Sequence, residues 1–599
     1  MNGQVLHSVH TESSSWARSR WAWVIRRLGW ARYRPNLFLG FVVLAGLLAG
    51  LASLAFYAAT NAAVRYGRSV TEGRGLAVVG LALGGGLLVG LLGAIGASPR
   101  FGGVTNVIYG AGLGRDLVGP WQTFKTFVRS VITIGTGGSA GREGPVVVIG
   151  AGVAGTLGRW LRVSEQEMRT LLAAGVAAGL AVAFNAPIAS SLFALEIILG
   201  DFGASTFSFV VLAAVSASVL AYGFLGNQPV LKVAAYTFRH WAEIPLYAGL
   251  GIVAGLAGQL YIHSIRRARR LFRRLPGPEW VRPGVGGLIF GAVGVALPLT
   301  LGGDYSPIAV SMQGGLSWLA LLGLMGAKLF TTSVTLGSGG AGGVFAPGFV
   351  IGAFLGGSYG VLMHGLLPGV ASASGGYALV GLGAMLSGFT LAPITSILLL
   401  FEITRDYAII LPAMVASVAA YKVSGAFGPY NIETLSLHEA GIEWRSGRQI
   451  NLLREVTASE AMCRQVRTVS EDETVADVVA LMQRYRYTGF PVVDGGGRLV
   501  GVVTLEDVRE TPMDGRLERP VSEVMSREPI VSHPDDTLDR VLRELSAHRV
   551  GRVLVVDPAD PGRLLGIITK SDVLRAYNER LLRSQPRPPE ELEPGVGGE

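Results

Sequence analysis

The stretch Gly141-Arg-Glu-Gly-Pro145 begins an apolar segment, Val-Val-Val-Ile-Gly-Ala-Gly, and places a glutamate at its start. A second stretch, Gly343-Val-Phe-Ala-Pro347, begins another apolar segment in the same manner. Proline suits the first turn of a helix, and the backbone N–H groups of that turn have no intrahelical partner. Two such helix starts that met in a medium of low dielectric would offer positive dipole ends and free donors to an anion, without any full positive charge. The two stretches therefore predict a site for a small halide.

The composition of the chain is that of an integral membrane protein. Of its 599 residues, 50% are hydrophobic and only 16% are charged, and the mean hydropathy is +0.45. Soluble domains have about 25% charged residues. Apolar segments follow one another over residues 36–427, and no Asp, Glu, Lys or Arg occurs between Lys328 and Glu402. Since one span needs ~20 residues, this region crosses or re-enters the bilayer several times.

The apolar region contains an internal repeat. Residues 138–145 align with residues 340–347, and Ala186-Pro-Ile188 aligns with Ala392-Pro-Ile394. Gly and Pro interrupt the apolar segments in both halves, and backbone that is not helical survives at membrane depth only where protein buries it or where it lines a cavity. Paired halves with broken segments are typical of a transporter with its site near the middle of the bilayer. We therefore expect an all-helical membrane domain over residues 36–440, built from two inverted halves with broken helices.

Arginine is concentrated in two places that flank apolar segments, residues 18–34 and residues 266–274. The net charge of +9 is therefore assigned to cytoplasmic flanks under the positive-inside rule, and not to nucleic-acid binding. Residues 1–35 are expected to form a basic N-terminal segment on the cytoplasmic side. The one cysteine, Cys463, excludes an intramolecular disulfide and a zinc site with several cysteines, and no metal site is expected.

Glu143 is a carboxylate in an apolar setting. A carboxylate at membrane depth costs about 2.5–3.5 kcal/mol on insertion scales, so it needs a partner or a function. If ionised, Glu143 would fill the anion site that its own helix start creates; if protonated or displaced, it would vacate that site. The alternative is a glutamate that caps the helix and reaches a water-filled vestibule.

Four motifs resemble those of the CLC family of chloride channels and chloride/proton exchangers: GREGP at 141–145, FNAPIASSLFALE at 184–196, GSGGAGGVFAP at 337–347 and LAPITSILLLFEIT at 391–404. The resemblance covers roughly residues 36–440. It implies a homodimer with one pore per subunit, gated in each by Glu143. It also implies that the anion is bound at the two helix starts, with the amides of Val344 and Phe345 at the central site. The residues so implied are Gly141, Arg142, Gly144, Gly343, Val344, Phe345 and Ala346.

Three positions depart from the family pattern. Gly102 and Gly103 lie in Phe101-Gly-Gly-Val-Thr105, where the family's first anion motif has a serine, so that hydroxyl donor is absent. Glu433 falls where the family has a central tyrosine, and the neighbouring Tyr430 substitutes for it if the register differs. Ile197 occupies the place of the inner proton-relay glutamate of many exchangers, and it cannot carry a proton.

The missing relay glutamate favours a voltage- or pH-gated chloride channel. One alternative is a chloride/proton antiporter, since some exchangers of the family also lack that glutamate. Another is a transporter of a different small anion, such as nitrate or fluoride, because both side-chain donors have changed. Glu196 and Glu402 are interpreted as structural carboxylates that pair with backbone or cytoplasmic arginine; with Asp406 they would form the basis of a weaker alternative, cation transport. No enzyme is expected, because His438-Glu439 lacks the second histidine of a zinc protease and no phosphate-binding Gly-Lys-Ser/Thr loop occurs.

A second, soluble repeat follows the membrane region. Phe490-Pro-Val-Val-Asp494 and Gly501-Val-Val-Thr504 recur as Val553-Leu-Val-Val-Asp557 and Gly566-Ile-Ile-Thr569. Each unit is expected to run strand, helix, strand, strand, helix, and the two are expected to pack as one body. The repeat resembles a pair of α/β cystathionine-β-synthase (CBS) domains at residues 455–515 and 516–578, after a linker at residues 441–454.

This second resemblance implies that the CBS pair regulates transport. In CBS domains a Thr-x-x-Asp element contacts an adenine nucleotide (ATP, ADP or AMP), and the matching residues here are Thr504, Asp507, Thr569 and Asp572. A Thr/Asp helix cap explains the same spacing equally well, and no required cofactor is expected.

Taken together, these observations predict a multi-pass protein of a plasma membrane, the inner membrane of a prokaryote, with both termini in the cytoplasm. Its expected partners are chloride, membrane lipid and a second copy of the chain. Residues 579–599 are expected to be a disordered tail.

Overall fold

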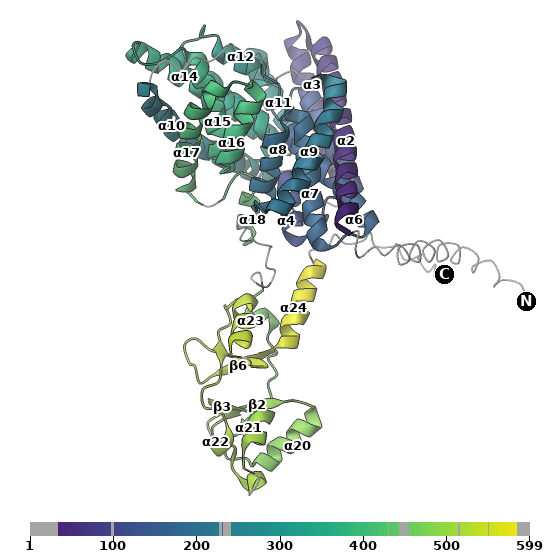
Figure 1. Cartoon of the computed structure of the whole chain (residues 1–599), viewed down its shortest axis with the longest axis vertical. Helices are drawn as coiled ribbons and strands as arrows, with labels where there is room; N and C mark the ends of the chain where they lie inside the picture. Colours follow the sequence, from purple (N-terminus) through teal and green to yellow (C-terminus); the bar gives the residue numbers. More distant parts are fainter. Residues whose placement is uncertain are drawn as a thin grey trace, which may run out of the picture. The chain divides into compact units, whose positions relative to one another are not determined.

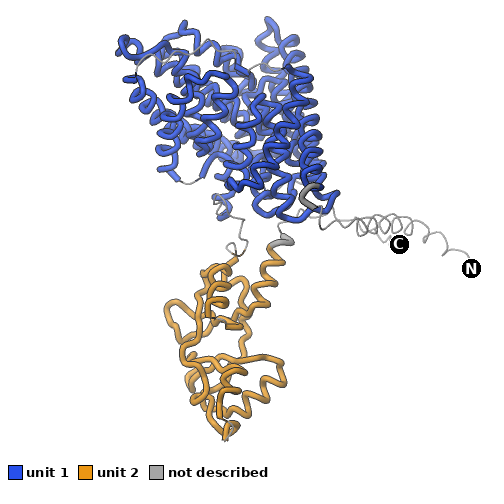
Figure 2. The backbone as a smooth tube through the Cα atoms, viewed as in Figure 1, with its two compact units in different colours: residues 1–449 blue, residues 450–599 orange. Residues whose placement is uncertain are grey.

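The computed structural model describes residues 34–583, apart from residues 97–100, 227–229, 232–240, 429, 443–452, 454–455, 513–514 and 549. The chain divides into two compact units, Met1–Gln449 and Ile450–Glu599 (Figure 2). Most of the expected N-terminal segment, of the linker and of the C-terminal tail lies outside the described residues.

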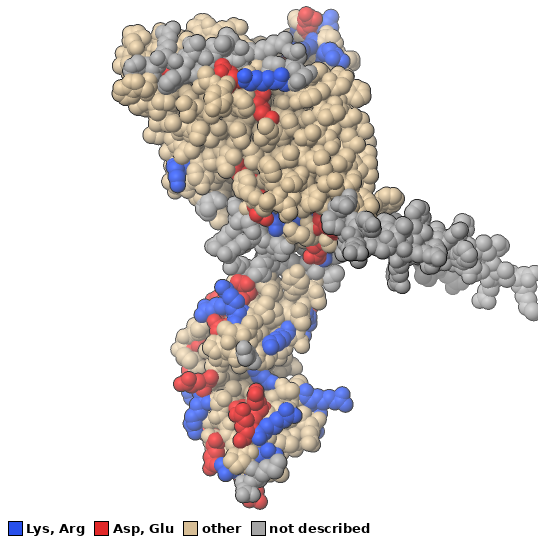
Figure 3. Space-filling view, in the orientation of Figure 1, with Lys and Arg blue, Asp and Glu red and all other residues tan. Residues whose placement is uncertain are grey.

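Unit 1 is a helical domain (Figure 1). Among its described residues, nine helices are long and apolar enough to cross a membrane: α2, α3, α6, α7, α9, α10, α13, α14 and α17. Figure 3 shows a broad surface of this unit with few charged residues, as a lipid-facing surface requires. The multi-pass membrane domain expected from the sequence is confirmed. Its helices are α2 (Arg34–Thr71), α3 (Gly75–Ala94), α4 (Gly103–Leu113), α5 (Gly119–Gly135), α6 (Glu143–Leu161), α7 (Glu165–Phe184), α8 (Pro187–Phe193), the π-helical turn η1 (Ala194–Leu199), α9 (Ala204–Leu225), α10 (Ile244–Arg273), α11 (Arg282–Ala296), α12 (Ser306–Met312), α13 (Trp318–Gly337), α14 (Phe345–Leu366), α15 (Ser374–Thr390), α16 (Pro393–Thr404), α17 (Ile410–Gly425) and α18 (Leu435–Glu439).

The sequence repeat reappears as a repeated packing of helices. Helix α6 packs against α7, and α14 packs against α15. Where α6 and α7 cross, a Cβ atom on Gly150 would lie 2.2 Å from the carbonyl oxygen of Gly175. Where α14 and α15 cross, a Cβ atom on Gly352 would lie 2.6 Å from the carbonyl oxygen of Gly381. Both crossings need glycine because the two backbones touch, which is how small residues pack membrane helices.

The broken helices lie at equivalent places in the two halves. Helix α7 ends at Phe184 and α15 at Thr390. The residues that follow them, Asn185 and Leu391, adopt left-handed backbone (φ 51° and 55°). Pro187 and Pro393 then begin the short helices α8 and α16, which pack against each other. A left-handed turn followed by proline ends one helix and redirects the chain into the next.

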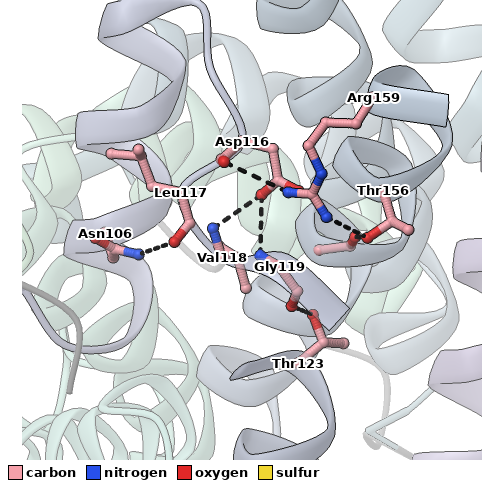
Figure 4. A network of polar contacts seen from close by, with 9 residues as sticks. Asn106, Asp116, Leu117, Val118, Gly119, Thr123, Thr156 and Arg159 are labelled. Carbon is pink, nitrogen blue, oxygen red and sulfur yellow. Dashed lines mark hydrogen bonds and ion pairs between the residues drawn. The ribbon is translucent and has the colours of Figure 1, made fainter. Parts of the chain in front are cut away.

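A polar network fixes the loop before α5 against α6 (Figure 4). The Asp116 carboxylate, which is inaccessible to solvent, accepts a hydrogen bond from the amide of Val118 (2.8 Å) and pairs with Arg159 of α6. Asn106 of α4 donates to the carbonyl oxygen of Leu117 (3.1 Å). The ion pair with Arg159 thus anchors the C-terminal end of α6 to this loop.

Unit 2 contains two three-stranded sheets of the same topology. Their orders are β1-β2-β3 and β4-β5-β6, with the first pair of strands parallel and the second pair antiparallel. The surface of this unit carries many charged residues (Figure 3). The strands are β1 (Val469–Ser470), β2 (Gly489–Val493), β3 (Leu499–Thr504), β4 (Val531–Ser532), β5 (Arg552–Val556) and β6 (Leu564–Thr569), and the helices are α19 (Ala458–Ala461), α20 (Val475–Tyr485), α21 (Leu505–Glu510), α22 (Val521–Val524), α23 (Leu538–Ala547) and α24 (Lys570–Arg583).

The two soluble repeats exchange their leading segments. Cys463, ahead of the first repeat, pairs with Ile567 in strand β6 of the second, and Ser526 of the second pairs with Val502 in strand β3 of the first. Each core is therefore completed by residues of the other repeat, such as Met462 in the core around α23, β5 and β6. The expectation that the repeats pack as one body is confirmed.

Candidate anion site

The two helix starts predicted from the sequence meet. The amide of Gly141 donates to the carbonyl oxygen of Gly343 (2.8 Å), and the amide of Gly343 donates to the carbonyl oxygen of Gly141 (2.7 Å). Helices α6 and α14 begin directly after this pair of hydrogen bonds. A Cβ atom on Gly144 would lie 2.6 Å from the Cα atom of Gly343, so the contact requires glycine. Two sets of unpaired helical N–H groups, with the positive ends of two dipoles, are thereby brought to one place.

The Glu143 carboxylate bridges the two starts. Only 2% of this residue is exposed. Its Oε2 atom accepts a hydrogen bond from the amide of Ala346 (3.3 Å) in the first turn of α14, and its Oε1 atom accepts one from the hydroxyl of Tyr305 (2.5 Å). The side chain therefore places a negative group on a donor that the sequence assigns to the anion. Such an arrangement lets a tethered carboxylate and a free anion compete for the same amides.

Aromatic side chains surround the start of α14. Phe345 is buried and packs edge-on against Phe193, with ring centroids 5.3 Å apart. The hydroxyl of Tyr261 in α10 donates to the carbonyl oxygen of Val344 (2.9 Å). The same carbonyl oxygen also accepts a hydrogen bond from the amide of Gly348 (3.1 Å), so Tyr261 is tied to the first turn of α14.

Two of the three departures from the family pattern, the Gly102–Gly103 turn and Glu433, come together at the start of α4. The hydroxyl of Thr105 donates to the carbonyl oxygen of Glu433 (2.7 Å), which places the Gly102–Gly103 turn beside the loop that carries Glu433. Tyr430 instead stacks on His438, with ring centroids 4.8 Å apart. The structure therefore places the backbone of Glu433 beside α4, and which of the two side chains takes the place of the tyrosine stays a prediction.

Ile197 follows one of the two repeat-related glutamates, and both glutamates bind the short helices α8 and α16. Ile197 is buried in the π-helical turn η1. Glu402 accepts hydrogen bonds from the amide of Ala189 (2.6 Å) at the start of α8. Glu196 accepts hydrogen bonds from the amide and the hydroxyl of Thr395 (2.7 and 2.6 Å) at the start of α16. Each carboxylate caps the short helix of the other half, which confirms the structural interpretation of both and gives no support to cation transport.

Tyr305 and Lys328 are parts of the site that sequence reasoning missed. Tyr305 follows Gly-Gly-Asp and precedes α12, and it belongs to none of the motifs. Lys328 is completely buried in α13, where its ammonium donates to the carbonyl oxygens of Thr300 (3.1 Å) and Gly302 (2.8 Å). The one available signal was the position of Lys328 at the edge of the long charge-free stretch.

In the soluble unit, the predicted nucleotide residues form helix caps. The Thr504 hydroxyl donates to the Asp507 carboxylate (2.6 Å), and the Thr569 hydroxyl donates to the Asp572 carboxylate (2.6 Å). Each aspartate also accepts a bond from the threonine's own amide. The geometry is that of the capping box, the alternative that the spacing left open.

Comparison with known proteins identifies the family. The model of the family described as "Voltage gated chloride channel" matches residues 97–425, which is more than half of the chain. The chain belongs to the voltage gated chloride channel (CLC) family. The CBS domain model matches residues 458–514 and 521–579, so a CBS pair accompanies the CLC domain. Both resemblances drawn from the motifs are confirmed.

Two curated relatives show what this CLC protein is similar to. It is 37% identical over 359 residues to a "Putative chloride channel protein ClcB-like" of Ralstonia nicotianae, spanning 59% of this chain and 83% of that protein. It is 34% identical over 302 residues to the "H(+)/Cl(-) exchange transporter ClcA" of Citrobacter koseri, spanning 49% of this chain and 64% of that protein. Both relatives are named as channels or transporters, and neither as an enzyme.

Solved structures share the fold. A slow cyanobacterial Cl⁻/H⁺ antiporter matches 67% of this chain and 97% of its own, with 25% identity and a TM-score of 0.61. The structure of a eukaryotic CLC transporter covers 89% of this chain and 97% of its own chain, with 23% identity and a TM-score of 0.60. The chain is thus a CLC anion transporter, and the comparisons favour the antiporter alternative over the channel that Ile197 suggested.

Proposed function

We propose that this protein exchanges chloride for protons, with Glu143 as the gate. Similarity to an H⁺/Cl⁻ exchange transporter and to a Cl⁻/H⁺ antiporter supports the coupled reaction. The observation that carries the proposal is the hydrogen bond from the Ala346 amide to the Glu143 carboxylate. A group that can gain and lose a proton lies on a donor to which the transported anion would bind.

The coupling follows from that shared donor. An ionised Glu143 side chain occupies the joint between α6 and α14. It excludes chloride from the Ala346 amide by charge repulsion and by volume. Protonation removes the charge that the helix dipoles attract, so the side chain leaves and chloride takes its place. Because neutral amides hold the anion, it is bound without a fixed cation that would trap it. The replacement of the Glu143 side chain by chloride at this site therefore couples the movement of a proton to the movement of an anion.

Ile197 supports a second candidate, passive chloride conductance gated by Glu143. A buried isoleucine holds no proton, so exchange requires an inner proton route through other groups. The two candidates agree on the anion path and differ in whether a proton gradient drives the anion.

A reversal-potential measurement separates the candidates. The full chain is reconstituted in liposomes under a chloride gradient, and a pH gradient is then added. Exchange shifts the reversal potential when the pH gradient is added; passive conductance leaves it unchanged. Glu143→Gln should abolish the shift and leave chloride flux measurable, whereas Glu72→Gln, at an exposed position at the end of α2, should behave like the wild-type protein. Repeating the flux assay with nitrate and fluoride ranks the anions.

We further propose the remaining features that the family resemblance implied. They are a homodimer with one path per subunit, a prokaryotic inner membrane with both termini in the cytoplasm, and regulation of transport by the CBS pair. Nucleotide binding at Thr504, Asp507, Thr569 and Asp572 stays a prediction, to be tested by titrating the purified protein with ATP, ADP and AMP.

A further inference from the structure

The Tyr305 hydroxyl is bonded to the gate itself. It donates to Oε1 of Glu143 at 2.5 Å, a length typical of a hydroxyl bonded to an ionised carboxylate. The donor comes from the segment before α12, far in sequence from the two motifs that build the anion site. Its ring lies near Phe349 of α14, with centroids 6.2 Å apart.

The backbone that carries Tyr305 is held in place from two sides. Lys328 clamps the carbonyl oxygens of Thr300 and Gly302, as described above. The amide of Gly302 donates to the carbonyl oxygen of Gly137 (3.0 Å), and a Cβ atom on Gly303 would lie 2.0 Å from the carbonyl oxygen of Ala140. The backbone directly before Tyr305 is therefore held in place, and the hydroxyl reaches Glu143 from this anchored segment.

Space for such a movement lies beside the hydrogen bond. A cavity of about 360 Å³ is lined by Glu143 and Tyr305 together with Tyr57, Arg142 and Asn185. This volume is enough for a carboxyl group that has left the start of α14, since one water occupies about 30 Å³ of liquid.

We propose that Tyr305 is a latch, a positioning residue that holds the ionised Glu143 carboxylate over the anion site. Protonation of the carboxylate weakens this hydrogen bond, and departure of the side chain breaks it. The latch therefore lowers the pH at which the path opens and limits the escape of an unprotonated gate. The proposal rests on Glu143 being the gate and deepens the exchange proposed above.

Other charged and titratable groups lie around Glu143 and Tyr305. Arg142, at the start of the same helix, and Tyr261 of α10 interact electrostatically with Glu143, and Tyr57 of α2 and Asp304 line the same cavity. Asp304 in turn pairs with Arg68 and interacts with Lys328. Substituting Tyr305 by phenylalanine leaves all of them in place. A difference between the two proteins therefore reports the hydroxyl.

The test is the chloride flux of reconstituted Tyr305→Phe protein as a function of pH. A hydrogen bond to a charged group stabilises the ionised gate, so its loss should raise the midpoint of the pH profile by about one unit, the equivalent of a tenfold change. Flux at neutral pH should rise by up to about tenfold, and fewer protons should accompany each chloride. Tyr359→Phe, a half-buried tyrosine of α14 that packs near Gly249, is the matched control and should leave the profile unchanged.

A double substitution decides whether the hydroxyl acts through the gate. In the Glu143→Gln background, which lacks the charge, Tyr305→Phe should change flux by less than about twofold. An equal effect in both backgrounds would overturn the latch, because Tyr305 would then act on the shape of the path. An unchanged pH midpoint in the wild-type background would also overturn it.

Two further outcomes keep the proposals separate. A wild-type protein that ignores a pH gradient removes the exchange proposal, while the flux profiles still test the latch. If Tyr305→Phe protein does not fold, Tyr305→Leu removes the same hydroxyl without altering any charge and should move the midpoint in the same direction; no movement would contradict the latch.

Discussion

The contact between the two helix starts gives the most direct prediction, tested by Gly343→Ala. The new Cβ atom would lie 2.5 Å from the amide nitrogen of Gly144 and 3.0 Å from its Cα atom. Because non-bonded heavy atoms sit about 3.5 Å apart, the two starts would have to separate by about 1 Å. That separation stretches the reciprocal Gly141–Gly343 hydrogen bonds, now 2.8 and 2.7 Å, beyond the ordinary range.

Gly343→Ala should lower both the stability of the protein and its rate of chloride transport. Two weakened backbone hydrogen bonds cost about 1–3 kcal/mol of stability. The larger effect should be on transport, because donors from α6 and α14 no longer converge on one position. A misplacement of about 1 Å in a site of fixed geometry lowers a rate by about a hundredfold, and we expect a fall in chloride turnover of about ten- to a hundredfold.

The assay is chloride efflux from liposomes, with the fold of each variant checked by thermal unfolding and by elution as a single species. Gly84→Ala is the control, since a Cβ atom there meets nothing within 4 Å on the exposed side of α3. The control should transport at the wild-type rate. Folded Gly343→Ala protein with wild-type turnover would refute the idea that the joined helix starts bind the anion.

Three other predictions follow from the same structure. Glu402→Ala removes the carboxylate that caps α8, and it should lower the free energy of unfolding by about 1–3 kcal/mol; an unchanged melting temperature would contradict the capping role. In the soluble unit, the Thr474 hydroxyl bonded to Asp477 holds the pKa of that carboxyl below its ordinary value. A carboxyl group whose pKa is lowered in the folded state stabilises that state at a pH above its unfolded pKa of about 3.9, and this stabilisation is lost as the pH falls. Thr474→Ala should therefore lower the melting temperature at neutral pH, and the difference from the wild-type protein should vanish in acid. Removing the residues after 450 should leave anion selectivity unchanged while altering the regulation of flux, and a change in selectivity measured by reversal potential would show that the CBS pair shapes the path.

The meeting of the helix starts could be predicted because its signal is local and repeated. Gly-rich turns before proline appear at Gly141 and again at Gly343, and a repeat places equivalent segments at equivalent depths. The caps formed by Glu196 and Glu402 were predictable in kind for the same reason. Their partners, each on the short helix of the other half, become evident once α8 and α16 are packed together.

The contacts of Tyr305 and Lys328 could not be predicted, since neither has a local signature. A tyrosine after Gly-Gly-Asp is compatible with a surface loop. The role of Tyr305 depends on its hydrogen bond to the Glu143 carboxylate, and only tertiary packing brings the two oxygen atoms to 2.5 Å. A lysine in an apolar helix suggests a buried partner without saying which one. The choice between Tyr430 and Glu433 was likewise a question of register, and the bond from Thr105 to the Glu433 carbonyl shows only that the backbone of this loop lies beside α4.

The placement of the cationic side chains explains why a tethered carboxylate can control an anion here. Lys328 is completely buried, yet its ammonium is directed to the carbonyl oxygens of Thr300 and Gly302. The guanidinium of Arg142 lies over the ring of Tyr57, 4.9 Å from its centroid. The attraction at the joint of α6 and α14 therefore comes mainly from oriented amides, and these hold an anion more weakly than a fixed ion pair in the same low dielectric would. Weak attraction is what the proposed competition requires, because in that exchange chloride has to leave when Glu143 returns ionised, and Glu143 has to leave when a proton cancels its charge.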